Sequence, residues 1–84
     1  MDDIADWRKR IDEIDEKILQ LLNERAGCAI EIGKIKSVKG IEVTDQARED
    51  KILAHLAEIN HGPLSDDAVQ NLFKCLIRES KNLE

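Results

Sequence analysis

Apolar residues recur along the first part of this chain at alternating spacings of three and four residues. The repeat is interrupted at Arg25 and ends at Val38-Lys39-Gly40, and its members are Ile4, Trp7, Ile11, Ile14, Ile18, Leu21, Cys28, Ile32 and Ile35. This heptad pattern predicts a helix over about residues 4–37 whose apolar seam faces another helix. Such a helix is roughly 50 Å long, which is too long for a compact monomer of this size.

A second apolar stripe lies beside the seam, and it widens the apolar surface in the middle of the same helix. Its members are Leu19, Leu22, Ala26, Ala29 and Gly33. A helix that is apolar over more than one narrow seam needs cover on more than one side. Shorter helices of the same chain supply part of that cover, and a symmetry mate is the commonest source of the rest. We therefore expect an intertwined homodimeric helical bundle.

Two shorter helices follow the long one. The first is predicted over about residues 45–60, with Thr44 or Asp45 as its N-cap and His61-Gly62-Pro63 as a stop signal. The second is predicted over about residues 65–83, where Ser65 is the N-cap. Their apolar faces comprise Ile52, Leu53, Leu56 and Ile59, then Val69, Leu72, Phe73, Leu76 and Ile77. The fold class is thus all-α, with one long and two short helices in a single domain, 1–84.

Composition narrows the classes of partner. The 84 residues carry a net charge of −5 and only two aromatic side chains, which argues against binding nucleic acid. No long uncharged apolar run occurs, so we expect neither a signal peptide nor a membrane span. Cys28 and Cys75 form no CxxC pair and lie among apolar residues. We expect reduced core cysteines and no metal site, in a chain of the cytoplasm.

Polar residues interrupt the apolar faces at four positions. Arg25 occupies a seam position, and Lys36 follows eleven residues later in nearly the same direction around the helix. Ser80 and Glu84 continue the stripe of Phe73 and Ile77 on the last helix. Each has a structural explanation when taken singly, such as pairing of Arg25 with a glutamate. Together they predict a polar pocket, and two inward cations favour an anionic ligand such as a carboxylate.

Arg8 lies on the same long helix as Arg25 but seventeen residues earlier. The two positions are roughly 25 Å apart along the helix, too far to bind one small ligand within one chain. If the long helices of two chains pair antiparallel, Arg8 of one chain approaches Arg25 of the other. Periodicity alone favours a plainer interpretation, a solvated arginine near the start of a helix.

Five short motifs resemble one known family, and together they span nearly the whole chain. They are R-x-x-I-D-x-I-D from Arg8, L-L-x-x-R ending at Arg25, I-G-x-x-K ending at Lys36, D-x-x-R-E from Asp45 to Glu49, and L-F-x-x-x-I-x-x-S ending at Ser80. Each motif alone is weak, but all five occur in order and at matching spacing. The chain resembles the all-helical chorismate mutases, the AroQ class.

The resemblance implies the Claisen rearrangement of chorismate to prephenate, a step toward phenylalanine and tyrosine, without a metal or cofactor. It implies that Arg25 and the other subunit's Arg8 clamp the substrate carboxylates, and that Lys36 donates to the ether oxygen. By the same resemblance, Glu49 is expected to accept from the ring hydroxyl, helped by the backbone near Asp45 and Arg48. Ser80 is expected to contact a carboxylate, Glu84 to lie near the ether oxygen, and Ile32, Ile52 and Ile77 to form apolar walls.

Two residues depart from the commonest pattern of that family. Glu84 stands where many members have glutamine, and a carboxylate cannot donate to the ether oxygen, so we hypothesise that Glu84 acts in its protonated form. Lys81 replaces a residue that is often apolar, and it either extends outward or adds a cation near the substrate. The alternatives to a mutase are an isochorismate pyruvate-lyase on the same scaffold and a non-catalytic regulatory dimerisation module.

Overall fold

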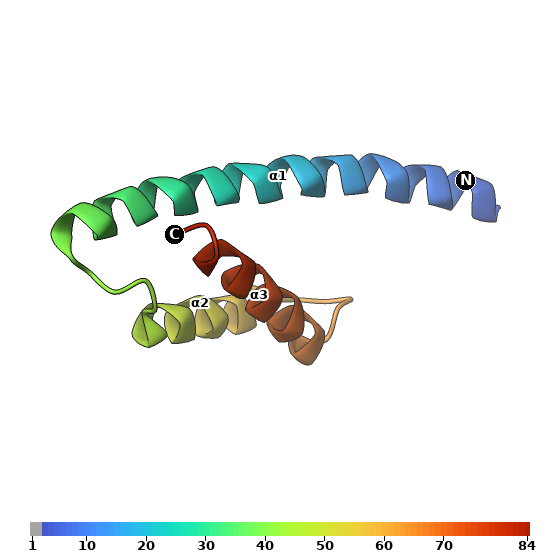
Figure 1. Ribbon diagram of the computed structural model, residues 1–84. Coiled ribbons are helices and arrows are strands. Elements are labelled where there is room, and N and C mark those ends of the chain that lie inside the picture. The colour runs from blue at the N-terminus through green and yellow to red at the C-terminus, as the bar shows by residue number, and fades with distance from the viewer. Residues whose placement is uncertain (1–2) are drawn as a thin grey trace.

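The computed structural model describes residues 3–84 and consists of three helices (Figure 1). They are α1 (Ile4–Lys39), α2 (Gln46–Ile59) and α3 (Asp66–Lys81). The expected all-α fold with one long and two short helices is confirmed. The long helix, expected to about residue 37, continues to Lys39, and the last one, expected to about residue 83, ends at Lys81. In residues 3–84 no helix is long and apolar enough to cross a membrane.

The ends of the helices follow from local sequence. At the start of each helix a polar side chain accepts a hydrogen bond from the backbone N–H three residues further on, and these caps are Asp3, Asp45 and Ser65. Gly40 ends α1 in the left-handed conformation, with φ of 67°, and its N–H bonds back to carbonyls of the last turn. The capping residues therefore define where α1 ends and where α2 and α3 begin.

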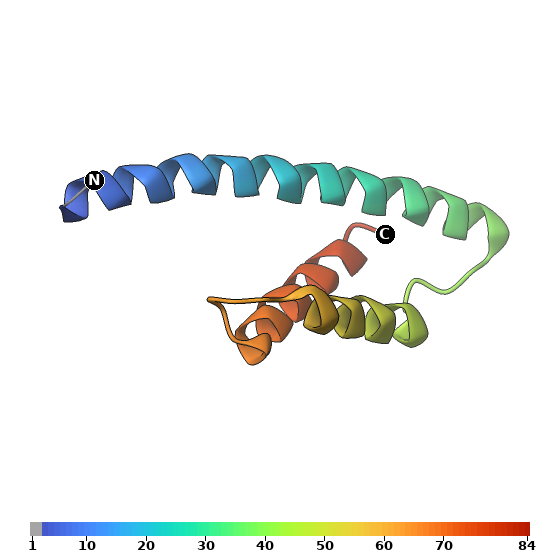
Figure 2. The same ribbon diagram turned by 180° about the vertical axis from the view of Figure 1, so that it is seen from behind.

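The two short helices pack against each other beneath the C-terminal half of α1, and the end of α3 reaches α1 (Figures 1 and 2). The contact uses the second apolar stripe, because Ala29 and Gly33 are the buried residues of α1 and Ile77 is the buried residue of α3. Small side chains at these two positions let the helices come close together. This approach encloses the space in which the polar residues gather.

The N-terminal half of α1 projects beyond α2 and α3 and gives the molecule its length of 55 Å (Figure 2). Its apolar seam stays open in the single chain: Trp7 is 56% exposed and Leu21 is 62% exposed. The other open members of this half are Ile4, Ile11, Ile14 and Ile18. The helices of the chain itself thus cover the C-terminal end of the second stripe, at Ala29 and Gly33, and leave Leu19 and the heptad seam of this half open.

Both cysteines are free, and both are exposed in the single chain. The expectation that they lie in the core is wrong for this chain on its own. Cys28 belongs to the heptad seam, which α2 and α3 leave largely open, and Cys75 lies on the side of α3 that turns away from its neighbours.

Candidate active site

A pocket of about 330 Å³ lies between the C-terminal half of α1, the start of α2 and the end of α3. A volume near 300 Å³ suits a small organic ligand. Ten of the eleven residues that the sequence predicted for the site line this pocket: Arg25, Ile32, Lys36, Asp45, Arg48, Glu49, Ile52, Ile77, Ser80 and Glu84. Three helices therefore bring together residues that are up to 59 positions apart in the sequence.

Arg25 and Ser80 meet across the interface between α1 and α3. Arg25 Nη1 donates to Ser80 Oγ, and that hydroxyl in turn donates to the carbonyl of Leu76 at 2.8 Å. Within residues 3–84 no carboxylate lies in ion-pair distance of Arg25. Arg25 is therefore not paired with a structural glutamate in this part of the chain. The guanidinium keeps most of its five N–H donors and its full charge for an anion in the pocket.

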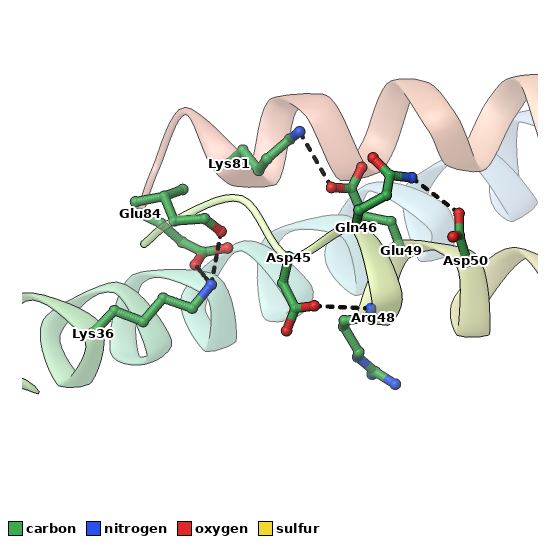
Figure 3. Close-up of polar contacts among 9 residues, drawn as sticks. Lys36, Asp45, Gln46, Arg48, Glu49, Asp50, Lys81 and Glu84 are labelled. Carbon is green, nitrogen blue, oxygen red and sulfur yellow. Dashed lines mark hydrogen bonds and ion pairs between the residues drawn. The ribbon is translucent and has the colours of Figure 1, made fainter. Parts of the chain in front are cut away.

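Lys36 and Glu84 form the most buried ion pair of the site (Figure 3). Lys36 Nζ lies 2.7 Å from Glu84 Oε1, and the two side chains are 16% and 11% exposed. The directed hydrogen bond of the ammonium goes instead to the carbonyl of Val43, at 2.8 Å. Glu84 Oε1 is buried and accepts no well-aligned hydrogen bond from residues 3–84, so it keeps capacity to interact with a ligand.

Gly33 sets the position of Glu84. A Cβ atom added to Gly33 would lie 2.7 Å from Glu84 Cα and 2.8 Å from Glu84 O, which is closer than non-bonded atoms approach. The I-G-x-x-K motif thus joins two functions on one helical turn. Glycine admits the backbone of Glu84, and Lys36, three residues later, reaches its carboxylate.

The first turn of α2 and the last turn of α3 together form another wall of the pocket. Lys81 Nζ lies 3.3 Å from Glu49 Oε2, which resolves the question of whether Lys81 extends outward or toward the pocket (Figure 3). Asp45 caps α2 by accepting from the N–H of Arg48 at 3.0 Å. That cap fixes where α2 begins, and Glu49 lies in the first turn of this helix.

The pocket carries more positive than negative charge. Its cationic residues are Arg25, Lys36, Arg48 and Lys81, and its acidic residues are Asp45, Glu49 and Glu84. Apolar walls come from the three predicted isoleucines. No group of three or more His, Cys, Asp or Glu side chains in residues 3–84 is arranged to hold a metal ion. Such a surface suits a small, partly apolar anion with more than one negative charge.

Arg8 is the predicted site residue that does not line the pocket of its own chain. It is exposed in the N-terminal half of α1, the half that projects away from α2 and α3 (Figure 1). Sequence reasoning left Lys81 undecided and assigned no role in the site to Cys28, Ala29 or Val43, which also line the pocket. The backbone of Val43 gave no sequence signal, and Gly33 was placed in the second stripe without a role in the site.

Comparison with known proteins gives one consistent answer. Residues 7–84 match the family model described as chorismate mutase type II. The chorismate mutase of Methanocaldococcus jannaschii is 35% identical over 82 residues, covering 96% of this chain and 83% of that protein. A bifunctional chorismate mutase/prephenate dehydratase of Aquifex aeolicus is 40% identical over 88 residues, but the chain spans only 24% of its length. The solved chorismate mutase (form II) of Thermus thermophilus superposes with a TM-score of 0.93 at 36% identity, covering 95% of this chain and 91% of that one.

Proposed function

The chain belongs to the type II chorismate mutase family, and on that premise we propose that it isomerises chorismate to prephenate, a step toward phenylalanine and tyrosine. The observation that carries the proposal is the pocket itself, in which three helices gather Arg25, Lys36, Glu49 and Ser80. In this proposal residues 1–84 form a single chorismate mutase domain. The free thiols of Cys28 and Cys75 suit a reducing compartment, and we place the activity in the cytoplasm.

The reaction requires neither a covalent bond to the protein nor a proton transfer from it. Chorismate is a dianion with two carboxylates, an ether oxygen and a ring hydroxyl, and its rearrangement is unimolecular, without proton transfer or a covalent intermediate. The pocket has to hold the compact conformer in which the two reacting carbons meet. It also has to stabilise the negative charge that grows on the ether oxygen as the C–O bond breaks.

The cationic residues of α1 carry both tasks in this proposal. Arg25 binds one substrate carboxylate through its guanidinium, and Ser80, which already accepts from Arg25, contacts a carboxylate as well. Lys36 donates to the ether oxygen from its buried position beside Glu84. Substrate binding then replaces part of the contact between Lys36 and Glu84 in the empty pocket.

Glu84 donates a hydrogen bond to the same ether oxygen when its carboxyl group is protonated. The support for this role is its burial and the lack of a well-aligned hydrogen bond to Oε1 from residues 3–84. Glu49 accepts from the ring hydroxyl, beside the backbone at Asp45 and Arg48, and Ile32, Ile52 and Ile77 pack on the ring.

A second copy of the chain completes the site in this proposal. The open seam of α1, from Ile4 to Leu21, supplies an apolar surface for an antiparallel partner helix. Arg8 of one chain would then approach Arg25 of the other and bind the second carboxylate. Each dimer would hold two sites, and each site would need both chains.

The decisive experiment follows the loss of chorismate absorbance with wild type and with Arg25→Ala. We expect wild type to turn over chorismate and Arg25→Ala to lose most of this activity, about 100-fold or more, because a substrate carboxylate loses a buried charged partner. Arg78→Ala is the matched control, since Arg78 is exposed on α3 outside the pocket. Undiminished turnover by Arg25→Ala would refute the site assignment. If the wild type turned over isochorismate instead of chorismate, the activity would be that of an isochorismate pyruvate-lyase and not of a mutase.

The shared site has its own test. An Arg8→Ala chain is mixed with an Arg25→Ala chain, and subunits are allowed to exchange. If each site takes Arg8 from one chain and Arg25 from the other, every mixed dimer regains one intact site and the mixture is more active than either variant alone. A mixture that stays as inactive as its components contradicts the shared site.

A further inference from the structure

Lys81 and Glu49 join the end of α3 to the start of α2 at the wall of the pocket (Figure 3). They are 32 residues apart in the sequence, and Lys81 Nζ lies 3.3 Å from Glu49 Oε2. The side chains are 31% and 18% exposed, so both are partly withdrawn from water. This pair is therefore better shielded than the surface pairs of the chain, such as Lys34–Glu31, whose side chains are 67% and 69% exposed.

The contact engages one oxygen of Glu49. In residues 3–84 no partner is found for Oε1, which leaves that oxygen free to accept from a ligand. A glutamate side chain has several rotatable bonds, and fixing it costs conformational entropy. Lys81 supplies a partner for Glu49 before the ligand arrives, and this restriction of Glu49 lowers the entropy cost of binding.

Lys81 also contributes to the charge of the pocket. It is one of the four cationic side chains that line the pocket of the single chain, against three acidic ones. Without its partner, the carboxylate of Glu49 would repel the two carboxylates of chorismate across a small, poorly solvated space. A neutral residue at position 81 therefore affects binding even though it leaves Glu49 in place.

We propose that Lys81 is a positioning residue that acts through Glu49. Its ammonium holds Glu49 Oε2 and compensates its charge, so that the other oxygen accepts from the ring hydroxyl of chorismate. This inference rests on the proposed mutase function. The ring hydroxyl takes no part in bond breaking, so its contact is equally strong in the substrate and the transition state. Loss of Lys81 then raises KM and leaves kcat nearly unchanged.

The test is a double-mutant cycle on turnover of chorismate, with Lys81→Met, Glu49→Gln and the double variant. We expect Lys81→Met to raise KM about tenfold with kcat within about twofold of wild type. In the Glu49→Gln background the same change has almost no further effect, since Lys81 has lost the group it holds. Lys81→Arg restores most of the affinity, and Lys74→Met, on the exposed side of α3, behaves as wild type.

Several results would overturn the inference. An unchanged KM in Lys81→Met shows that the contact has no role in binding. An equal loss in the Glu49→Gln background shows that Lys81 acts directly on the substrate. Lys81→Gln serves as the second neutral variant if Lys81→Met loses its helical circular dichroism. If the wild type does not convert chorismate, the proposed function is refuted and the inference falls with it. If the wild type converts chorismate and Lys81→Met has the same KM, only the inference is refuted.

Discussion

Replacing Gly33 by alanine tests how α1 positions the carboxylate of Glu84. The new Cβ would lie 2.7 Å from Glu84 Cα and 2.8 Å from Glu84 O. Carbon atoms in contact prefer separations of about 3.5–4.0 Å, so the backbone of Glu84 has to retreat by about 1 Å. Lys36 Nζ lies 2.7 Å from Glu84 Oε1, and a retreat of this size moves the carboxylate away from the ammonium and weakens the contact.

Stability and activity should respond differently to this change. Alanine favours the interior of a helix over glycine by about 1 kcal/mol. The crowding against Glu84 costs about 1–3 kcal/mol, because an added methyl group forces a backbone shift. The free energy of unfolding therefore falls by at most about 2 kcal/mol. A misplacement of about 1 Å at a reacting centre, in contrast, lowers kcat by about 100-fold.

The assay combines kcat for chorismate with thermal unfolding followed by circular dichroism. Gly27→Ala is the matched control on the same helix, since a Cβ there has nothing within 4 Å and leaves the pocket untouched. We expect Gly27→Ala to keep its activity and to gain about 1 kcal/mol in stability. Wild-type kcat in Gly33→Ala would refute the argument that the position of Glu84 matters. A large drop in melting temperature would mean that the loss of activity comes from unfolding.

Three further changes test separate parts of the structure. Glu84→Gln should flatten the pH–rate profile, because the amide donates at every pH, whereas wild-type kcat should fall as the pH rises; a flat wild-type profile contradicts a protonated Glu84. Ile77→Ala should lower the free energy of unfolding in urea by about 2–5 kcal/mol, since Ile77 is 6% exposed, and a loss below about 1 kcal/mol would mean that α3 is not held by this contact. Ser65→Ala should cost about 1 kcal/mol by removing the cap of α3, with kcat unchanged; an equal stability without the hydroxyl would show that the cap is not needed.

Periodicity and stop signals in the sequence were sufficient to predict the three helices, their order and their approximate ends. They did not predict which apolar surface of the long helix meets the helices of its own chain. Both stripes have helical spacing, and spacing defines a direction around the helix but not the neighbour in that direction. The choice depends on side-chain size, because Ala29 and Gly33 allow the close approach of α3 that the larger residues of the seam would prevent.

The site was predictable where a polar residue interrupts an apolar face. Arg25, Lys36 and Ser80 were found in this way, and the structure brings all three to one pocket. Arg48 and Glu49 lie near the start of a helix, where polar residues are ordinary, so their prediction depended on the resemblance. The partner of Lys81 was not predictable, because it depends on how the end of α3 meets the start of α2, 32 residues away.

Under the proposed shared site, the open seam of α1 would make the activity of this protein depend on chain concentration. Trp7 is 56% exposed and Leu21 is 62% exposed in the single chain, and pairing of two chains would bury this surface. Dilution would then reduce both the number of complete sites and the stability of the fold, and both would fall over the same range of chain concentration. At concentrations where such dimers are partly dissociated, halving the amount of chain would lower the number of dimers by more than half. The activity would then fall more steeply than the amount of protein.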